Sequence, residues 1–492
     1  MPIPRVCPPS AILVAALSAA CTTEPEGTPD GPTDSTGADS TGANSTGADS
    51  TEPTSADSTG ADSTGDAPPP DACPAPTGPG TDVATTLDAD ATWTADGSPY
   101  RISATTYLTA TITLEPCTVV ALAPAARLLV GNDPAPGGVV AHGEVVDDGE
   151  GGALRRPVRF ERLDPGGAWG SIEVDVTGTL DAETADFVGG GSVDAGGILV
   201  GWGADPAGAP TPNLRLRDVT VVDAESSGIY LPNRGAFTPD SADVRITGTG
   251  ATGFPIWVQA GAVGSLPADL EIVDNAEDVV LVETFTNVDG DTFPDRGVPL
   301  RIDDTLYLGT VESDGLSTLT IEAGVELQFA TGGAGSGIII GLDDTHLGQI
   351  VAAGTAQRPI VMRSAEATPA AGDWMGLYFR YSPTDGNVLD HVTITHAGAS
   401  SGAQGFGCGP AENDASILLL TAQPLSPFLS DVTIADAGGD TQLLLGWLDA
   451  SPSATAQAFA DGNTFADSPA CGVSLPRDTD NGCPGDEEPD CL

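Results

Sequence analysis

The stretch Asn287–Asp295 (NVDGDTFPD) carries residues of the types that bind a hard metal ion. Asn287, Asp289, Asp291 and Asp295 place oxygen donors along a short, Gly-containing segment, as calcium-binding loops require. The stretch departs from the EF-hand pattern because its Gly stands at the fourth position and no Glu closes it. We interpret it as a candidate calcium site, and the alternative is an acidic loop between two repeats.

Six of the cysteines could form disulfides, since an even set in an exported chain favours them. They are Cys73, Cys117, Cys408, Cys471, Cys483 and Cys491. The sequence does not select among the pairings, and the pairing we predict is Cys73–Cys117, Cys408–Cys471 and Cys483–Cys491. A zinc site is disfavoured because no C-x-x-C pair exists and His is scarce. No Cys lies in a context typical of a nucleophile.

Short strands must position these residues. Apolar residues alternate with polar ones in four segments, each closed by Gly, Asp or Pro: Leu319–Phe329, Gly348–Ser364, Asp373–Phe379 and Leu389–Gly398. Almost no room is left between them for a helix. A weaker copy of this pattern begins about 200 residues earlier, near Tyr100, which indicates a duplication.

A shorter period lies within each copy. Asp218, Asp243 and Asp269 each open a strand at a spacing of about 25 residues, which is typical of a solenoid whose coils bury their apolar faces by stacking. Asp390 and Asp431 are expected to continue this column in the second copy, as turn caps rather than as ligands of a shared cation. β-Sandwich domains are the competing fold.

Other conspicuous side chains have structural interpretations. Trp169 and Trp374 occupy equivalent places in the two copies and are expected to pack inside rather than to stack on a sugar. His391 and His396 lie five residues apart. They are predicted to lie on one strand, so they face opposite sides and cannot hold one ion together.

The order EAGVELQF, AAGTAQRPIVM, GDWMGLYF and LDHVTITHAG resembles the right-handed parallel β-helix (pectin-lyase-like) repeat of bacterial surface proteins. The resemblance implies an all-β solenoid with two tandem related halves. Galacturonase-type enzymes of this fold carry Asn-Thr-Asp and Gly-His-Gly elements, and neither occurs here. The acidic doublets Asp147-Asp148, Asp303-Asp304 and Asp343-Asp344 are expected to lie in turns. Arg380 has no acid cluster near it in the sequence, so we assign no catalytic residue.

The N-terminus has the features of an export signal. Arg5 precedes the short apolar run Ala11–Leu17, and small residues lead to Cys21. LSAAC resembles the lipobox of bacterial lipoproteins, in which the Cys is lipidated, although Leu17 stands four residues before Cys21 rather than three. Residues 22–72 repeat Ser, Thr, Gly, Ala and Asp with no apolar anchor and are expected to form a disordered linker.

Composition limits the partners. The formal net charge is −53, and all 17 basic residues are Arg. Nucleic acid and anionic lipid headgroups are therefore disfavoured, because both need clustered cations.

Together these observations predict an exported lipoprotein of the outer membrane or cell surface, or a secreted protein if Cys21 is not lipidated. Its β-helix would be a non-catalytic binding, adhesion or scaffold module for an extracellular polysaccharide or a surface protein, and only the lipid would touch the membrane. The alternative is a polysaccharide lyase or glycoside hydrolase. No cofactor is expected beyond the calcium considered above. The predicted parts are signal 1–20, linker 21–72, first half 73–286, acidic junction 287–298, second half 299–476 and acidic tail 477–492.

Overall fold

The computed structural model describes most of the chain from residue 70 onward. The described residues are 70–192, 196–202, 209–233, 235–284, 290–309, 315–331, 335–380, 384–399, 415–420, 423–439, 441–466, 471–477, 479–480, 483–484 and 490–492. They belong to one compact unit, Ala67–Leu492. Within these ranges no helix has the length and apolar character needed to cross a membrane.

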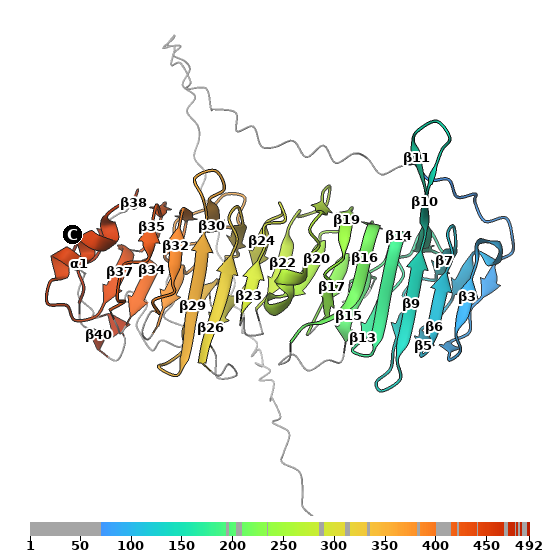
Figure 1. Ribbon diagram of the computed structural model, residues 1–492, viewed down its shortest axis with the longest axis horizontal. Helices are drawn as coiled ribbons and strands as arrows, with labels where there is room; N and C mark the ends of the chain where they lie inside the picture. Colours follow the sequence, from blue (N-terminus) through green and yellow to red (C-terminus); the bar gives the residue numbers. More distant parts are fainter. Residues whose placement is uncertain are drawn as a thin grey trace, which may run out of the picture. The chain divides into compact units, whose positions relative to one another are not determined.

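Coils of parallel strands build this unit, as the strand pattern predicts (Figure 1). In the second half, β26 (Gly315–Ile321), β27 (Glu326–Phe329) and β28 (Gly337–Ile340) follow one another around one coil. Each pairs in parallel with a strand of the next coil, namely β29, β30 and β31. Because the chain returns to the same side once per coil, its strands form ladders along the stack.

One sheet runs through both halves. Within the described part of the chain it has 14 strands. They are β2 (Thr86–Leu87), β5 (Thr106–Leu108), β8 (Leu128–Val130), β13 (Ile172–Asp175), β15 (Ile198–Trp202), β17 (Ile229–Leu231), β20 (Ile256–Gln259), β22 (Val280–Glu283), β24 (Leu300–Ile302), β27, β30 (Ile360–Ser364), β33 (Val392–Thr395), β36 (Thr433–Ala435) and β38 (Thr464–Phe465).

The first half also contains a 12-stranded sheet, again counted over the described residues. Its strands are β1 (Thr81–Asp82), β3 (Ala91–Trp93), β4 (Tyr100–Ile102), β6 (Thr111–Leu114), β7 (Val119–Leu122), β9 (Gly137–His142), β12 (Val158–Arg162), β14 (Gly178–Val188), β16 (Thr211–Val222), β18 (Gly235–Phe237), β19 (Ala242–Thr247) and β21 (Leu270–Ile272). The antiparallel hairpin of β10 (Glu144–Asp147) and β11 (Ala153–Arg156) projects beside it (Figure 1).

Two further sheets serve the second half. One contains β23 (Asp291–Phe293), β26, β29 (His346–Ala353), β32 (Val388–Asp390) and β35 (Leu429–Ser430). The other contains β25 (Thr305–Leu308), β28, β31 (Leu377–Phe379), β34 (Ala415–Leu420), β37 (Thr441–Gly446) and β39 (Cys471–Val473). A short helix, α1 (Pro452–Ala460), lies before β38.

The predicted junction 287–298 does not interrupt the stack. β22 pairs directly with β24 across it, Val280 opposite Leu300. The 12-stranded sheet ends at β21, and the two other sheets of the second half begin at β23 and β25. The two halves therefore share the 14-stranded sheet, whereas the other sides of the coil belong to different sheets in each half.

Inward residues stack coil on coil to form the core. Phe160 lies over Phe187 with ring centroids 4.7 Å apart, and Phe329 lies over Trp374 at 4.0 Å. Trp374 and its counterpart Trp169 are buried, and their indole Nε1 groups donate to the carbonyls of Thr395 and Val188 at 2.8 Å. Both tryptophans are packing residues, as predicted.

The predicted aspartate column is confirmed in the first half. Arg217 pairs with Ala242 and Val219 with Val244, so Asp218 and Asp243 face one another. Both adopt left-handed backbone, with φ of 51° and 55°, a region that Asp tolerates better than most residues. Asp269 follows one coil later, since its carbonyl accepts the N–H of Val244.

The column prediction is wrong for Asp390. Asp390 pairs with Ser430, so the residue opposite Asp431 is His391. His391 and His396 both have positive φ, 51° and 62°, and both lie outside β33. The premise that they belong to one continuous strand is also wrong, because the left-handed residues interrupt its alternation.

The structure confirms one predicted disulfide and contradicts the other two. Cys73 is bonded to Cys117. Cys471 is bonded to Cys491 rather than to Cys408, so neither Cys408–Cys471 nor Cys483–Cys491 forms. The reason is a strand pairing that spacing does not reveal. Ser474 forms an antiparallel bridge with Cys491, and the N–H of Leu475 donates to the carbonyl of Asp490.

Candidate functional site

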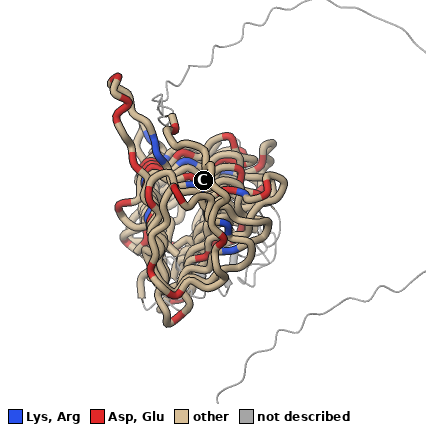
Figure 2. Tube along the Cα trace, turned by 90° about the vertical axis from the view of Figure 1, so that its right-hand side faces the viewer, with Lys and Arg blue, Asp and Glu red and all other residues tan. Residues whose placement is uncertain are grey.

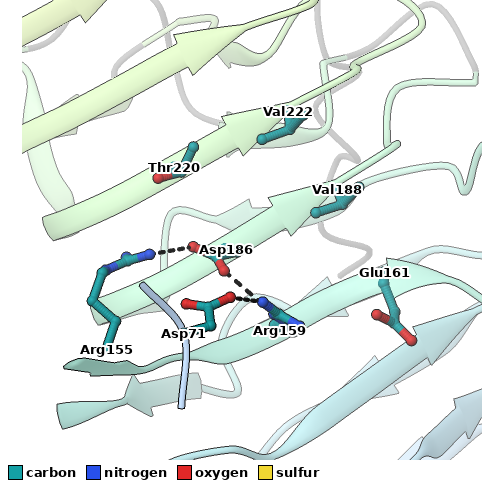
Figure 3. Close-up of a pocket in the computed structure, with 8 residues that line it drawn as sticks. All are labelled: Asp71, Arg155, Arg159, Glu161, Asp186, Val188, Thr220 and Val222. Atoms are coloured by element: carbon teal, nitrogen blue, oxygen red, sulfur yellow. Dashed lines mark hydrogen bonds and ion pairs between the residues drawn. The ribbon is translucent and has the colours of Figure 1, made fainter. Parts of the chain in front are cut away.

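An open cleft of about 400 Å³ lies on the outer face of the 12-stranded sheet, beside its hairpin. Its lining residues are Asp71, Arg155, Arg159, Glu161, Asp186, Val188, Thr220 and Val222 (Figure 3). β12, β14 and β16 supply most of them, because alternate residues of these strands point away from the core. Parallel register places Arg159 beside Asp186, and Asp186 beside Thr220.

Asp186 links the two arginines of the cleft. Its Oδ1 accepts a bond from Arg155 Nη1 at 3.0 Å, and its Oδ2 lies 3.4 Å from Arg159 Nε. Arg155 also donates through Nε to Asp218 Oδ2 at 3.1 Å and through Nη2 to the Asp218 carbonyl at 2.9 Å. Arg159 forms an ion pair with Asp71. The basic groups of the cleft are thus engaged by carboxylates of the chain itself (Figure 3).

Asp71 arrives from the segment that leads into the β-helix. Ala72 N–H donates to the carbonyl of Arg155 at 2.7 Å, and Arg155 N–H donates to the carbonyl of Pro70 at 3.0 Å. The Cys73–Cys117 disulfide closes the attachment. The end of the predicted linker is therefore fixed at one wall of the cleft.

The charge of Arg155 suits a structural role. Its side chain is 4% exposed. Burial alone lowers the pKa of Arg155, but attraction to Asp186 and Asp218 outweighs burial and raises it above its ordinary value. A lyase needs a group that can take up a proton at working pH, and this arginine is poorly suited to do so. Glu161 lies apart from the paired groups (Figure 3).

The sequence did not single out this cleft. Arg155 and Arg159 flank Pro157, and Asp186 lies further along the same weaker copy of the strand pattern. The signal that could have found it is the Arg-x-x-x-Arg spacing one coil before an outward Asp. Asp71 could not be assigned to the cleft from the sequence, because its position depends on how the segment before the β-helix folds back onto the sheet.

The residues predicted to bind calcium are only partly described. Asn287 and Asp289 lie outside the described residues. Asp291 begins β23, opposite Leu319. Asp295 Oδ2 accepts a bond from Arg358 Nη2 at 2.6 Å, and Asp295 Oδ1 accepts the N–H of Gly297. One predicted ligand thus already has a cationic partner, and the calcium site stays a prediction.

Other predicted positions are accounted for as follows. Cys21, Cys408 and the side chain of Cys483 lie outside what the structure describes. Asp343 accepts the backbone N–H groups of Thr345 and His346 at 2.8 Å, which confirms a turn. Hydrogen bonds from Thr345 and His346 hold the pKa of Asp343 well below its usual range.

A second group that sequence reasoning missed lies on the outer face of the 14-stranded sheet. Leu199, Tyr230, Trp257 and Leu281 occupy successive outward positions. The rings of Tyr230 and Trp257 lie 4.7 Å apart. The signal was present, since Tyr230 and Trp257 are about one coil apart in the sequence.

Glu283 ends β22 beside this row, and its Oε2 is buried with no hydrogen-bond partner among the described residues. Burial raises the pKa of Glu283. Burial, together with the charge of Glu283, raises the pKa of Tyr230 to about 12. An unpartnered buried carboxylate is unfavourable when ionised.

A family model described as "Pectate-lyase like beta helix domain" matches residues 306–416. A search of curated proteins and a search of solved structures each find no match to the chain. The matched residues include β26 to β33. With the long parallel sheets of the structure, this match defines the body as a right-handed parallel β-helix of the pectin-lyase-like class.

The arginine network gives a first prediction. Replacing Arg155 by Met leaves Asp186 without its buried partner, so the free energy of unfolding should fall by about 3 kcal/mol. Arg156→Met is the matched control, because the neighbouring Arg156 pairs with Glu144 at the exposed hairpin, and its loss should cost less than about 1 kcal/mol. Denaturant unfolding measures both variants. Equal effects would contradict a special role for Arg155.

Glu283 gives a pH prediction. Its folded-state pKa is raised, so the stability due to its proton is fully present below the unfolded value of 4.5 and is lost as pH rises through the folded pKa. Glu283→Gln should therefore match the wild type in acid and become the more stable protein near neutral pH. Melting curves across this range check it, and a difference that is constant with pH would refute the assignment.

Proposed function

We propose that this protein is an exported lipoprotein whose β-helix binds an extracellular polysaccharide through the cleft at Arg159 and Thr220, without catalysis. The observation that carries the proposal is an open cleft whose basic groups are held by the protein's own carboxylates. A rigid recess with polar groups around an apolar strip suits a sugar, which presents both kinds of surface.

The lining residues support this ligand class. Val188 and Val222 supply apolar surface next to one another in register. Thr220, Glu161 and the half-exposed Arg159 supply hydroxyl, acceptor and donor groups. A polyanion is less suited, because Asp71, Asp186 and Glu161 put negative charge in the same recess. A neutral or amino-substituted glycan fits these charges better.

Placement at the cell surface is the second part of the proposal. The resemblance of Leu17–Cys21 to a lipobox and the Ser/Thr/Gly/Asp-rich residues that follow support an anchor and a spacer. The spacer joins the body at the wall of the cleft through Asp71 and Cys73. We infer that the anchor presents the cleft outside the cell.

Blocking the cleft tests the binding function. Thr220→Tyr adds a ring inside it, and binding to insoluble polysaccharides in a pull-down series should fall at least tenfold. Thr247→Tyr is the control, because Thr247 is also an outward Thr of a neighbouring strand, opposite Val222, but does not line the cleft. Retained binding in Thr220→Tyr would refute the site.

The same preparations distinguish the other classes of function. Release of unsaturated or reducing ends from the polysaccharides would show a lyase or a glycosidase and overturn the non-catalytic assignment. If the protein bound none of the glycans but captured a surface protein, and Thr220→Tyr abolished that capture, the ligand of the cleft would be a protein rather than a polysaccharide.

Lipidation has its own test. Cys21→Ser should move the protein from the membrane fraction to the soluble fraction of a bacterial host that processes lipoproteins. Cys7→Ser is the matched control, since Cys7 lies within the predicted signal and its loss should leave the protein with the membrane. Membrane association that survives Cys21→Ser would disprove the anchor.

A further inference from the structure

Two histidine–aspartate contacts connect neighbouring coils near the end of the second half. Between β32 and β33 the chain turns at His391, and between β35 and β36 of the next coil it turns at Asp431. Both residues are left-handed, with φ of 51° and 52°. Because Asp390 pairs with Ser430, the His391 and Asp431 side chains lie one above the other.

His391 lies between two carboxylates. Its Nδ1 is 2.9 Å from Asp390 Oδ1, and its Nε2 is 3.8 Å from Asp431 Oδ2. One donor atom from each of the three residues lies within 4.8 Å of the others. The backbone is fixed on both sides, since His391 N–H donates to the Ser430 carbonyl at 3.0 Å and the His391 carbonyl accepts from Ile360 at 3.1 Å.

The charges of this group are not balanced. Among the ion pairs of the described residues, Asp390 and Asp431 pair with His391 alone, whereas Asp186 of the cleft contacts two arginines. With neutral His391 the group carries two negative charges within a few ångströms. Acidic residues lie on every side of the coil seen along the stack (Figure 2).

The orientation of the imidazole favours a metal ion. If Nδ1–H donates to Asp390, Nε2 carries the lone pair of the ring, and Asp431 Oδ2 lies 3.8 Å from that nitrogen. A carboxylate on the far nitrogen is the arrangement that orients histidine ligands in metal sites. Metal–nitrogen and metal–oxygen bonds to zinc are each about 2.0 Å, so one ion can reach both atoms.

We propose that Asp390, His391 and Asp431 form a binding site for one divalent transition-metal ion of the zinc class. An imidazole with carboxylates suits such ions, whereas calcium and magnesium prefer sets of oxygen donors. Asp431 is 61% exposed and His391 is 29% exposed, so an ion can enter from solvent and complete its coordination with water. The site is separate from the cleft, whose residues belong to other coils.

The same two coils contain a natural control. His396 and Asp436 also have positive φ, 62° and 51°, and their Nε2 and Oδ2 atoms lie 3.9 Å apart. Within the described part of the chain, His396 Nδ1 is buried without a hydrogen-bond partner, so no second carboxylate orients this ring there. This pair lacks the carboxylate that orients the imidazole at His391, and we expect it to bind the ion far more weakly.

Zinc titration of the full chain by calorimetry, with calcium and magnesium in excess to occupy unspecific carboxylates, tests the proposal. The wild type should bind one zinc ion per chain. His391→Asn and Asp431→Asn should each weaken binding at least tenfold, since Asn tolerates left-handed backbone and keeps the turn. His396→Asn and Asp436→Asn, the same changes in the same conformations, should leave the affinity unchanged.

Thermal melting provides a second measurement of zinc binding and shows whether each variant folds. Zinc should raise the melting temperature of the wild type and of the His396→Asn variant but not that of His391→Asn. If His391→Asn fails to fold, Asp390→Asn takes its place and should weaken binding as well. Absence of one-to-one binding in the wild type, or equal loss in the 391 and 396 variants, would overturn the proposal.

Discussion

Parallel register between coils is the constraint on which the rest of the structure depends. The backbone groups of the strands bond to the coil before or after them, so a strand residue's neighbours in space are those at the same point of the next coil. This explains why Phe160 lies on Phe187 and Phe329 on Trp374. It also explains why outward residues form rows, such as Arg159 beside Asp186 and Thr220. Core and surface are thus ordered by one geometric rule.

Residues with left-handed backbone form the corners between the sides of a coil and keep successive coils in register. Asp218, Asp243, His391 and Asp431 take up left-handed backbone where one side of the coil meets the next. Such residues turn the chain without adding length, and Asp tolerates this conformation better than a branched residue. The corners also stack polar side chains where solvent reaches them. A solenoid built this way accumulates charged columns at its corners, and those columns are where ion binding becomes chemically reasonable.

Much of the fold could be predicted from sequence because its signals are local. Alternation in Leu319–Phe329 and Gly348–Ser364 predicts β26, β27, β29 and β30, and equivalent positions in two copies identify Trp169 and Trp374 as packing residues. The predictions that were wrong depend on how residues far apart in the sequence pair with one another. A shift of one residue places His391, rather than Asp390, opposite Asp431. A strand pairing of the tail joins Cys471 to Cys491. Predicting the cleft would also have required knowing that the segment of Asp71 lies beside Arg159.

The scarcity of basic residues determines which carboxylates of the chain have a cationic partner. With 17 basic residues against 70 acidic ones, arginines can balance only some of the carboxylates. In the cleft, Arg155 and Arg159 hold Asp71, Asp186 and Asp218, and this joins the incoming segment to three consecutive strands of the sheet. At the His391 corner the carboxylates have an imidazole instead. In the first arrangement, carboxylates of the chain itself pair with the arginines of the open cleft. The second combines an imidazole with two carboxylates, which is the donor set on which the proposed transition-metal site rests. The same fold rule therefore produces two sites of opposite character, and the difference between them lies in which residue stands opposite an aspartate one coil away.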